Sequence, residues 1–368
     1  MQDDFHYYAT YCAAVLSGYS HEESMDICYS AQFVDLCSQT LLAKIKAPTG
    51  AATTMLQLEM MDARTDIAGL QEITRIWSSF HFLPRDLHAT LDKRHPKRYM
   101  NKYRLICGPN GELVAKTVVL AKGASLQSVG IAMHVVADTW AHAYFAGTPS
   151  LVINNTSDDF YELVTGEDGN ETERKIKFRH NPSAPDEPEK ALYTNSLFQR
   201  DENTIMNLGH GRAGHLPDYS FIRYSYLPAW NEYRVMIKDN PSDYMNAFCQ
   251  LIYAMKYIRG DIDKFETDRY DTGSVAPYTD RIRAIIEKRQ LKASDDWKAF
   301  GEELSGKTVE EFDIDRYQAE YVNAPSDKKN ETFIGKFVKG AMAHKGMVSH
   351  EIFASGNKLA GFVEALQR

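Results

Sequence analysis

Two histidines and an aspartate lie four residues apart in an otherwise apolar stretch, at His134, Asp138 and His142. Four residues advance an α-helix by little more than one turn, so the three side chains fall on one stripe. Their Ile, Ala, Met, Val and Trp neighbours predict that this stripe is buried. Because burying unpaired polar groups is costly, these side chains need partners. A divalent cation is one such partner, and a hydrogen-bonded His–Asp–His network inside a helical core is the alternative.

Other histidines and aspartates add to this stripe. His6 falls in a predicted N-terminal helix, Asp35 in the helix that follows, and His81 between two phenylalanines. Taken singly, such residues are more often packed core residues than ligands. Together with the stripe and with His215 and Asp218, they supply more nitrogen and oxygen ligands than one catalytic zinc ion requires.

The segment from Gly209 to Asp218 has glycines spaced as in a dinucleotide-binding loop, but no strand pattern precedes it, so we reject that interpretation. We expect a loop that brings His210 or His215, with Asp218, over a metal site. His210 and Arg212 are candidates to hold an anionic substrate group. The alternative is an ordinary tight connection with histidines facing solvent.

The composition restricts the class of protein. The chain has 368 residues, of which 43% are hydrophobic and 25% charged, as in globular proteins. A net charge of −8 argues against a surface for extended nucleic acid or for an anionic membrane. No signal-peptide pattern and no apolar stretch long enough to cross a membrane is present. An odd number of cysteines, five, excludes a full disulfide framework, so a cytoplasmic location is expected.

One common hydrolase class is also excluded. The sequence lacks the Gly-x-Ser-x-Gly turn that carries a nucleophilic serine. Chemistry based on a serine nucleophile on such a turn is therefore not expected.

The elements that must position these residues are mostly helices. Ser20 and Glu23 form a capping-box pair that predicts a helix running to about Leu42. Alternating residues after a Pro-Asn-Gly turn predict a small β-hairpin near 103–120. Residues 147–190 predict a long surface loop that covers one end of the domain, with short strands within it as the alternative. We therefore expect a mainly α fold, with a metal-binding domain over 1–272 and a helical extension over 273–368.

Four motifs together look like those of a bacterial protein family defined only as a domain of unknown function. They are Asp4-Phe-His6, Gln32-Phe-Val-Asp35, His134-x-x-x-Asp138 with His142, and Gly209-His-Gly followed by Pro217-Asp218. The resemblance runs from Met1 to at least Asp218. It implies no particular activity.

The order of these groups is also similar to that in the superfamily of zinc-dependent phospholipases C and fungal single-strand nucleases, which are helical enzymes with three zinc ions in a cleft. The resemblance implies a helical bundle of that type, and it implies these metal ligands: Met1, His6, Asp35, His81, His134, Asp138, His142, His215 and Asp218. Met1 would take the place of the N-terminal ligand. Asp35 and His81 would bind a buried ion, Asp138 would bridge ions, and the last three residues would complete a third site.

These observations lead to two hypotheses. In the first, the protein is a metal-dependent hydrolase of a small phosphoester, with two or three zinc ions that activate water and with Asp35 or Asp138 as the catalytic carboxylate. In the second, it is a non-catalytic helical protein in which the metal is structural. Zinc suits these ligands best, although iron, manganese and nickel share them. The sequence does not predict an oligomeric state.

Overall fold

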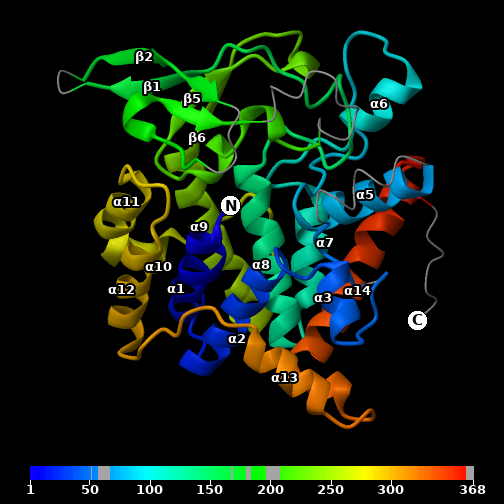
Figure 1. Cartoon of the computed structure of the whole chain (residues 1–368). Coiled ribbons are helices and arrows are strands. Elements are labelled where there is room, and N and C mark those ends of the chain that lie inside the picture. Colours follow the sequence, from blue (N-terminus) through cyan, green and yellow to red (C-terminus); the bar gives the residue numbers. More distant parts are fainter. Residues whose placement is uncertain (51, 57–66, 167–168, 180–183, 196–207, 362–368) are drawn as a thin grey trace.

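The computed structural model describes residues 1–50, 52–56, 67–166, 169–179, 184–195 and 208–361. The architecture is mainly helical, with small sheets gathered at one end of the helical part (Figure 1). The mainly α prediction is therefore confirmed at this level. The last residues of the predicted C-terminal extension, 362–368, lie outside the described residues.

The first part of the chain is almost entirely helical. It contains η1 (Asp4–Ala9), α1 (Thr10–Leu16), α2 (His21–Phe33), α3 (Gln39–Lys44), α5 (Ile67–Phe80), α6 (Lys97–Tyr103), α7 (Glu112–Ala121) and α8 (Leu126–Ala141). The predicted capping box opens α2, because the Ser20 side chain accepts from the Glu23 N–H and the Glu23 side chain accepts from the Ser20 N–H. However, α2 ends at Phe33, so Asp35 lies in the turn that follows and not within a helix.

Helix α8 lies at the centre of the bundle, where α2, α7, α9 (Asn240–Arg259) and α14 (Phe333–Ala354) pack around it (Figure 1). Gly130 permits the closest of these approaches. A Cβ atom at this position would come within 2.3 Å of the Ile27 carbonyl oxygen on α2. The central helix is therefore buried along its whole length, which is why its polar residues need internal partners.

The C-terminal helices pack on the same core. They are α10 (Thr272–Val275), α11 (Thr279–Glu287), α12 (Ser294–Ser305), α13 (Asp315–Asn323) and α14, joined by the short helices η7 (Ala276–Tyr278) and η8 (Lys329–Glu331). Helix α12 packs on η1 and α1, and α14 packs on α5 and α8. One cluster of buried apolar residues extends from the N-terminal helices to these C-terminal ones. The domain division at residue 273 stays a prediction.

A four-stranded antiparallel sheet forms the opposite layer. Its order is β2 (Glu171–Lys175), β1 (Tyr161–Thr165), β5 (Arg223–Tyr226) and β6 (Met236–Asp239), with Tyr161 opposite both Lys175 and Ser225. A second, parallel pair joins β3 (Lys177–Arg179) and β4 (Leu192–Thr194). Short helices accompany these strands: η2 (Pro188–Lys190), η4 (Gly211–Ala213), η5 (Leu216–Asp218) and η6 (Ala229–Asn231).

The predicted hairpin near 103–120 is wrong. Residues Glu112–Ala121 form helix α7, whose Leu113, Val114, Thr117 and Val118 are buried at helical spacing. A β-branched run favours strands in isolation, but packing against α8 determines the structure here. The hairpin β1–β2 lies instead within residues 147–190, predicted as a long loop. Positions 167–168 and 180–183 of that prediction lie outside the described residues.

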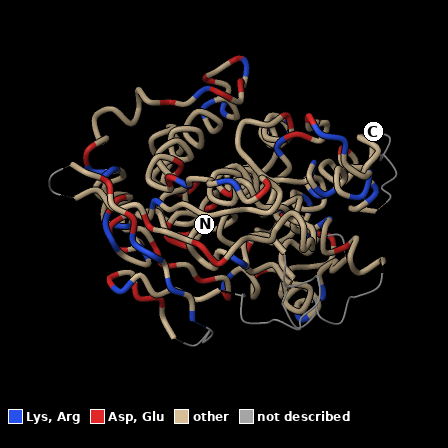
Figure 2. Tube along the Cα trace, turned by 90° about the horizontal axis from the view of Figure 1, so that it is seen from above, with Lys and Arg blue, Asp and Glu red and all other residues tan. Residues whose placement is uncertain are grey.

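Acidic and basic residues are interspersed on the outside of the trace (Figure 2). Among the residues that the structure describes, none of the helices combines the length and the apolar content that a membrane crossing requires. The five cysteines are buried free thiols.

Candidate metal centre

Helix α8 carries His134, Asp138 and His142 on one face. All three side chains are buried, and the helix ends at His142, which is its C-cap residue. The predicted buried stripe is therefore confirmed. Its carboxylate is the central group, because Asp138 lies within 3.5 Å of a ring nitrogen of each of four histidines.

The N-terminal helical turn brings His6 to this carboxylate. Residues Asp4–Ala9 form a π-helical turn, a geometry that often occurs at functional sites. His6 Nε2 lies 3.1 Å from Asp138 Oδ1, and the His6 ring stacks on that of His134 with 3.8 Å between centroids. Neither ring nitrogen of His6 nor the Oδ2 atom of Asp138 has a hydrogen-bond partner in the described part of the chain. Buried nitrogen and oxygen atoms without hydrogen-bond partners fit the ligand set of a metal ion.

Asp35 and His81 approach from the ends of two other helices. Asp35 follows α2 and His81 follows α5. His81 Nδ1 lies 3.7 Å from Asp35 Oδ1, 3.4 Å from Asp138 Oδ2 and 3.4 Å from His134 Nε2. Together with His134, these residues form a group of one carboxylate and two imidazoles whose ligand atoms lie within 4.8 Å of one another.

Backbone carbonyls orient the rings of this group. His134 Nδ1 lies 2.9 Å from the Ala31 carbonyl oxygen, and His81 Nε2 lies 3.1 Å from that of Thr54. Because a carbonyl only accepts, these ring nitrogens carry the hydrogens, which leaves His134 Nε2 and His81 Nδ1 as lone-pair donors. Both point at Asp138 Oδ2, another lone-pair atom, so the cluster needs either an added proton or a cation. Metal-ligating histidines are held in this way in known metalloproteins.

A third group repeats the arrangement beside the sheet layer. His142 Nδ1 donates to the His81 carbonyl oxygen at 2.7 Å, and His210 Nδ1 donates to that of Gly214 at 2.7 Å. The free Nε2 atoms then face Asp218, at 3.3 Å from Oδ1 for His142 and 3.9 Å from Oδ2 for His210. The ligand atoms of these three residues lie within 4.8 Å of one another.

The α-amino group of Met1 lies between the groups. It is 2.8 Å from Asp138 Oδ1, 3.3 Å from Asp218 Oδ1 and 3.2 Å from His142 Nε2. Burial opposes its charge, but the carboxylates of Asp138 and Asp218 raise the pKa of this amine to about 11. In the absence of metal, the ammonium is a cation that these acceptors share.

Neutral imidazoles and ionised carboxylates make up most of the cluster. Burial lowers the pKa values of His6, His134 and His210 to about 4, so these rings are neutral at pH 7. Burial alone would raise the pKa of Asp138, but His142 and the amine hold it well below the usual range. Despite burial, Asp138 and Asp35 raise the pKa of His81. Neutral imidazoles and ionised carboxylates are the forms that bind metal.

The structure distinguishes between the two histidines of the 209–218 segment. His210, predicted to bind substrate, belongs to the third group, whereas His215, predicted as a ligand, has a side chain that is 62% exposed. His215 Nδ1 contacts Asp218 Oδ2 at 3.1 Å from the outer side. Arg212 lies on η4, half-buried, with its carbonyl accepting from Asn195.

Sequence reasoning missed the groups that hold the ligands in place. Phe82 stacks on the His142 ring at 4.8 Å, and the carbonyls of Ala31, Thr54 and Gly214 fix three imidazoles. The phenylalanine next to His81 was a usable signal. The carbonyls give no signal, because every residue has one.

Solvent reaches one side of the cluster. Side chains of Asp35 and His210 are 28% and 17% exposed, whereas those of His6 and His134 are completely buried. Asp35 and His210 are therefore the ligands nearest to solvent, and the inner group has the closed character of a structural site.

Comparison with known proteins identifies a family but no activity. A family model described as "Family of unknown function (DUF6765)" matches residues 1–352. No curated protein and no solved structure matches the chain.

Proposed function

We propose that this chain, which belongs to the DUF6765 family of unknown function, is a metal-dependent hydrolase of a small phosphoester with a helical bundle of the zinc-dependent phospholipase C type. One observation carries the proposal. Four imidazoles (His81, His134, His142 and His210) each donate one ring N–H to a backbone carbonyl and turn the other nitrogen toward a carboxylate of the same cluster. Such preorganised lone pairs fit divalent cations, zinc above all.

The residues present fit two or three ions. Asp35, His81, His134 and Asp138 would hold one ion, and His142, His210 and Asp218 would hold another. His6, Asp138 and the Met1 amine would supply a third set. His210 replaces the predicted His215 in this ligand list because of its burial and orientation.

A divalent cation bound there would lower the pKa of a bound water molecule and offset negative charge on a phosphoester. Asp35 is the carboxylate that solvent reaches, so it is placed to accept a proton at the open side. Asp138, enclosed by imidazoles, would keep the rings and ions in place rather than exchange protons with solvent. Arg212 is our candidate for holding the phosphate anion.

The alternative, a purely structural metal, is favoured by one observation. His6, His134 and Asp138 are shielded from solvent and join the N-terminal turn to the central helix. A structural ion needs no open coordination position. Under this alternative, metal stabilises the protein and no hydrolysis occurs.

Metal content and hydrolytic activity distinguish the hydrolase proposal from the structural alternative. Elemental analysis of protein purified without chelator or nickel resin should give two or three zinc equivalents per chain. Hydrolysis of bis(p-nitrophenyl) phosphate should be lost on chelation and return with zinc. His134→Ala should lose both metal and activity, whereas His344→Ala, which removes another buried helical histidine outside the groups, should keep both. Activity that survives verified metal removal would overturn the hydrolase proposal, and metal without activity on a phosphoester panel would favour the structural alternative.

A further inference from the structure

A cavity of about 420 Å³ lies outside the three His/Asp groups, between α6, the turn at 106–110 and the end of α8. Its lining includes aromatic residues, which are Tyr103, Trp140, Tyr144 and Trp230, and charged residues, which are Arg85, Asp86 and Asp243. The combination of ring faces and a few charges is typical of a small-molecule site.

The aromatic wall is held in place by its own contacts. The rings of Tyr144 and Trp230 stack at 6.2 Å with 27° between planes, and Trp230 Nε1 donates to the Tyr144 carbonyl oxygen at 3.0 Å. Tyr103 meets the Trp230 ring edge-on at 6.1 Å. Because these rings are fixed, a flat ring can pack against them without ordering flexible side chains.

The charges in the wall leave a positive group without a partner. Asp243 accepts from the buried Lys238 ammonium, and Asp86 accepts from the His88 N–H at 2.8 Å. The guanidinium of Arg85, an exposed residue, makes no hydrogen bond or ion pair with any residue that the structure describes. The Arg85 guanidinium is therefore available to an anion that enters the cavity.

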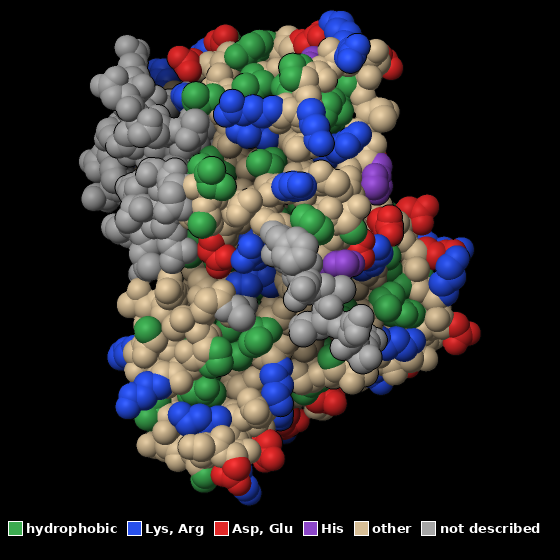
Figure 3. Space-filling model, turned by 90° about the vertical axis from the view of Figure 1, so that its right-hand side faces the viewer, with side chains coloured by type: hydrophobic (Ala, Val, Ile, Leu, Met, Phe, Trp, Pro, Cys, Tyr) green, Lys and Arg blue, Asp and Glu red, His purple; other side chains and the backbone are tan. Residues whose placement is uncertain are grey.

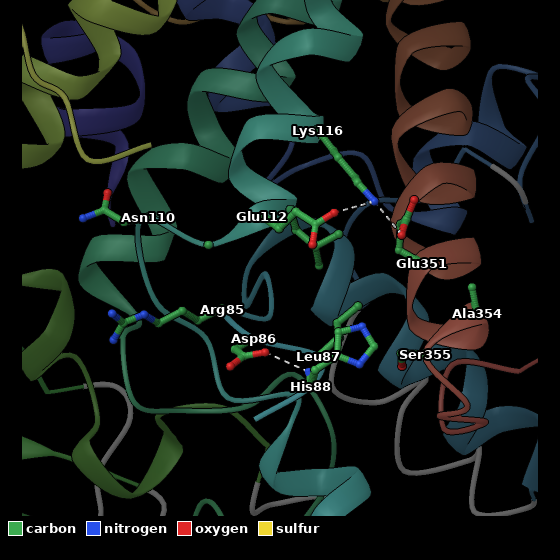
Figure 4. A pocket seen from close by; sticks show the side chains of 12 residues that line it. Arg85, Asp86, Leu87, His88, Asn110, Glu112, Lys116, Glu351, Ala354 and Ser355 are labelled. Carbon is green, nitrogen blue, oxygen red and sulfur yellow. Dashed lines mark hydrogen bonds and ion pairs between the residues drawn. The ribbon is translucent and has the colours of Figure 1, made fainter. Parts of the chain in front are cut away.

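In a neighbouring cavity, the lysine in the lining is paired with carboxylates. This cavity shares Arg85 and Asp86, and its lysine is paired, because Lys116 Nζ lies 2.9 Å from Glu112 Oε1 and 2.8 Å from Glu351 Oε2. In Figure 4 the Arg85 side chain points away from this chain of charges. Arg85 thus belongs functionally to the aromatic cavity.

The surface around the cavity adds further positive charge. Residues 93–104, which include α6 and Tyr103, contain six lysines and arginines (Lys93, Arg94, Lys97, Arg98, Lys102 and Arg104). Basic side chains gather in the upper part of the face shown in Figure 3. Such a local excess raises the concentration of anions near the opening.

We propose that this cavity binds a small aromatic anion, with its ring against Trp230 and Tyr144 and its carboxylate or phosphate on the Arg85 guanidinium. The site is separate from the metal centre and does not rest on the hydrolase proposal. The aromatic surface supplies affinity, and Arg85 selects for negative charge.

Isothermal titration of chelator-treated full-length protein tests this proposal, since removing metal prevents the anion from binding at the His/Asp groups. The probes are 2-naphthoate, 2-naphthyl phosphate and neutral 2-naphthamide. We expect one site per chain, with one of the anions bound at least tenfold more tightly than the amide. The preferred anion identifies the ligand as a carboxylate or a phosphate.

Variants distinguish binding in this cavity from adsorption elsewhere on the protein. Arg85→Met should weaken anion binding at least tenfold and leave amide binding unchanged, and Trp230→Leu should weaken both. Arg283→Met, at an exposed arginine outside both the cavity lining and the basic segment 93–104, is the matched control and should bind like wild type. Circular dichroism checks that each variant is folded. Equal binding of the anions and the amide, or full anion affinity in folded Arg85→Met, would overturn the proposal.

Discussion

The imidazole of His142 donates its Nδ1 hydrogen to the carbonyl oxygen of His81 at 2.7 Å. Two candidate ligands of different groups are thus joined directly, one by its side chain and the other by its backbone. Phe82 strengthens this link, because its ring stacks on the His142 ring at 4.8 Å. A shift of the turn after α5 would therefore move both groups together, so we expect ions in the two groups to bind interdependently.

Zinc should stabilise the protein through this cluster. Binding to the folded state alone adds about 4 kcal/mol at a thousandfold excess over Kd. Adding zinc to chelator-treated wild type should therefore raise Tm by several degrees in differential scanning fluorimetry. His134→Ala should lose this response, whereas His344→Ala should lower the starting Tm but keep the response. A normal zinc response in His134→Ala would rule out the inner group as a binding site.

The helical part of the site could be predicted because its signal is periodic. His134, Asp138 and His142 repeat every four residues in an apolar run, and Ser20 with Glu23 matches a capping motif. Both patterns arise within one helix, so no tertiary information is needed.

The other parts depend on tertiary contacts that leave no local pattern. His210 and His215 have similar neighbours, and only the fold around Gly214 turns the first toward Asp218. In α7, Val118 and its β-branched neighbours favour a strand by propensity, but burial against α8 makes the segment helical.

Asp4 should be much more important for stability than Asp3. The buried Asp4 carboxylate accepts from the N–H groups of Phe5 and Ala293, at 2.8 and 2.9 Å, and so fixes the turn that carries His6. Asp4→Ala leaves the Ala293 N–H without its partner, while the Phe5 N–H keeps its bond to the Gln2 carbonyl oxygen, and this loss costs about 1–3 kcal/mol. Asp3→Ala removes an exposed ion pair with Lys292 and should cost less than about 1 kcal/mol. Urea unfolding of both variants measures the difference, and equal midpoints would contradict this role of Asp4.

Lys345 should influence the metal centre from a distance. Its buried ammonium on α14 donates to the carbonyl oxygens of Gly50 and Thr53, next to Thr54, whose carbonyl accepts from His81. Lys345→Met should therefore lower zinc affinity about tenfold or more by loosening the His81 ring. Lys339→Met, at an exposed lysine of the same helix, is the control. Zinc titration with a competing chelator measures the affinity, and equal affinities in the two variants would contradict this link.

The metal-free protein should become less stable as the pH falls from 7 to 5. Burial lowers the pKa values of His6 and His134 to about 4, whereas unfolded imidazoles take up protons near pH 6.5. Between these values the unfolded state holds more protons, so acid favours unfolding. Each ring should contribute about 2 kcal/mol of loss between pH 6.5 and about pH 5.

The buried Asp4 carboxyl has the opposite effect on the pH dependence of stability. Burial raises its pKa to about 6, so between about pH 4 and 6 the folded state holds the extra proton and acid stabilises it. Burial also raises the pKa values of Asp35 and Asp26. Because the pKa values of four buried imidazoles (His6, His134, His210 and His344) are lowered, the net slope should still be a loss of stability. Thermal unfolding of chelator-treated protein from pH 7.5 to 5 should show this decrease in Tm, and His6→Gln should flatten it. A Tm independent of pH, or an unchanged slope in His6→Gln, would mean that these rings are not neutral and buried in solution.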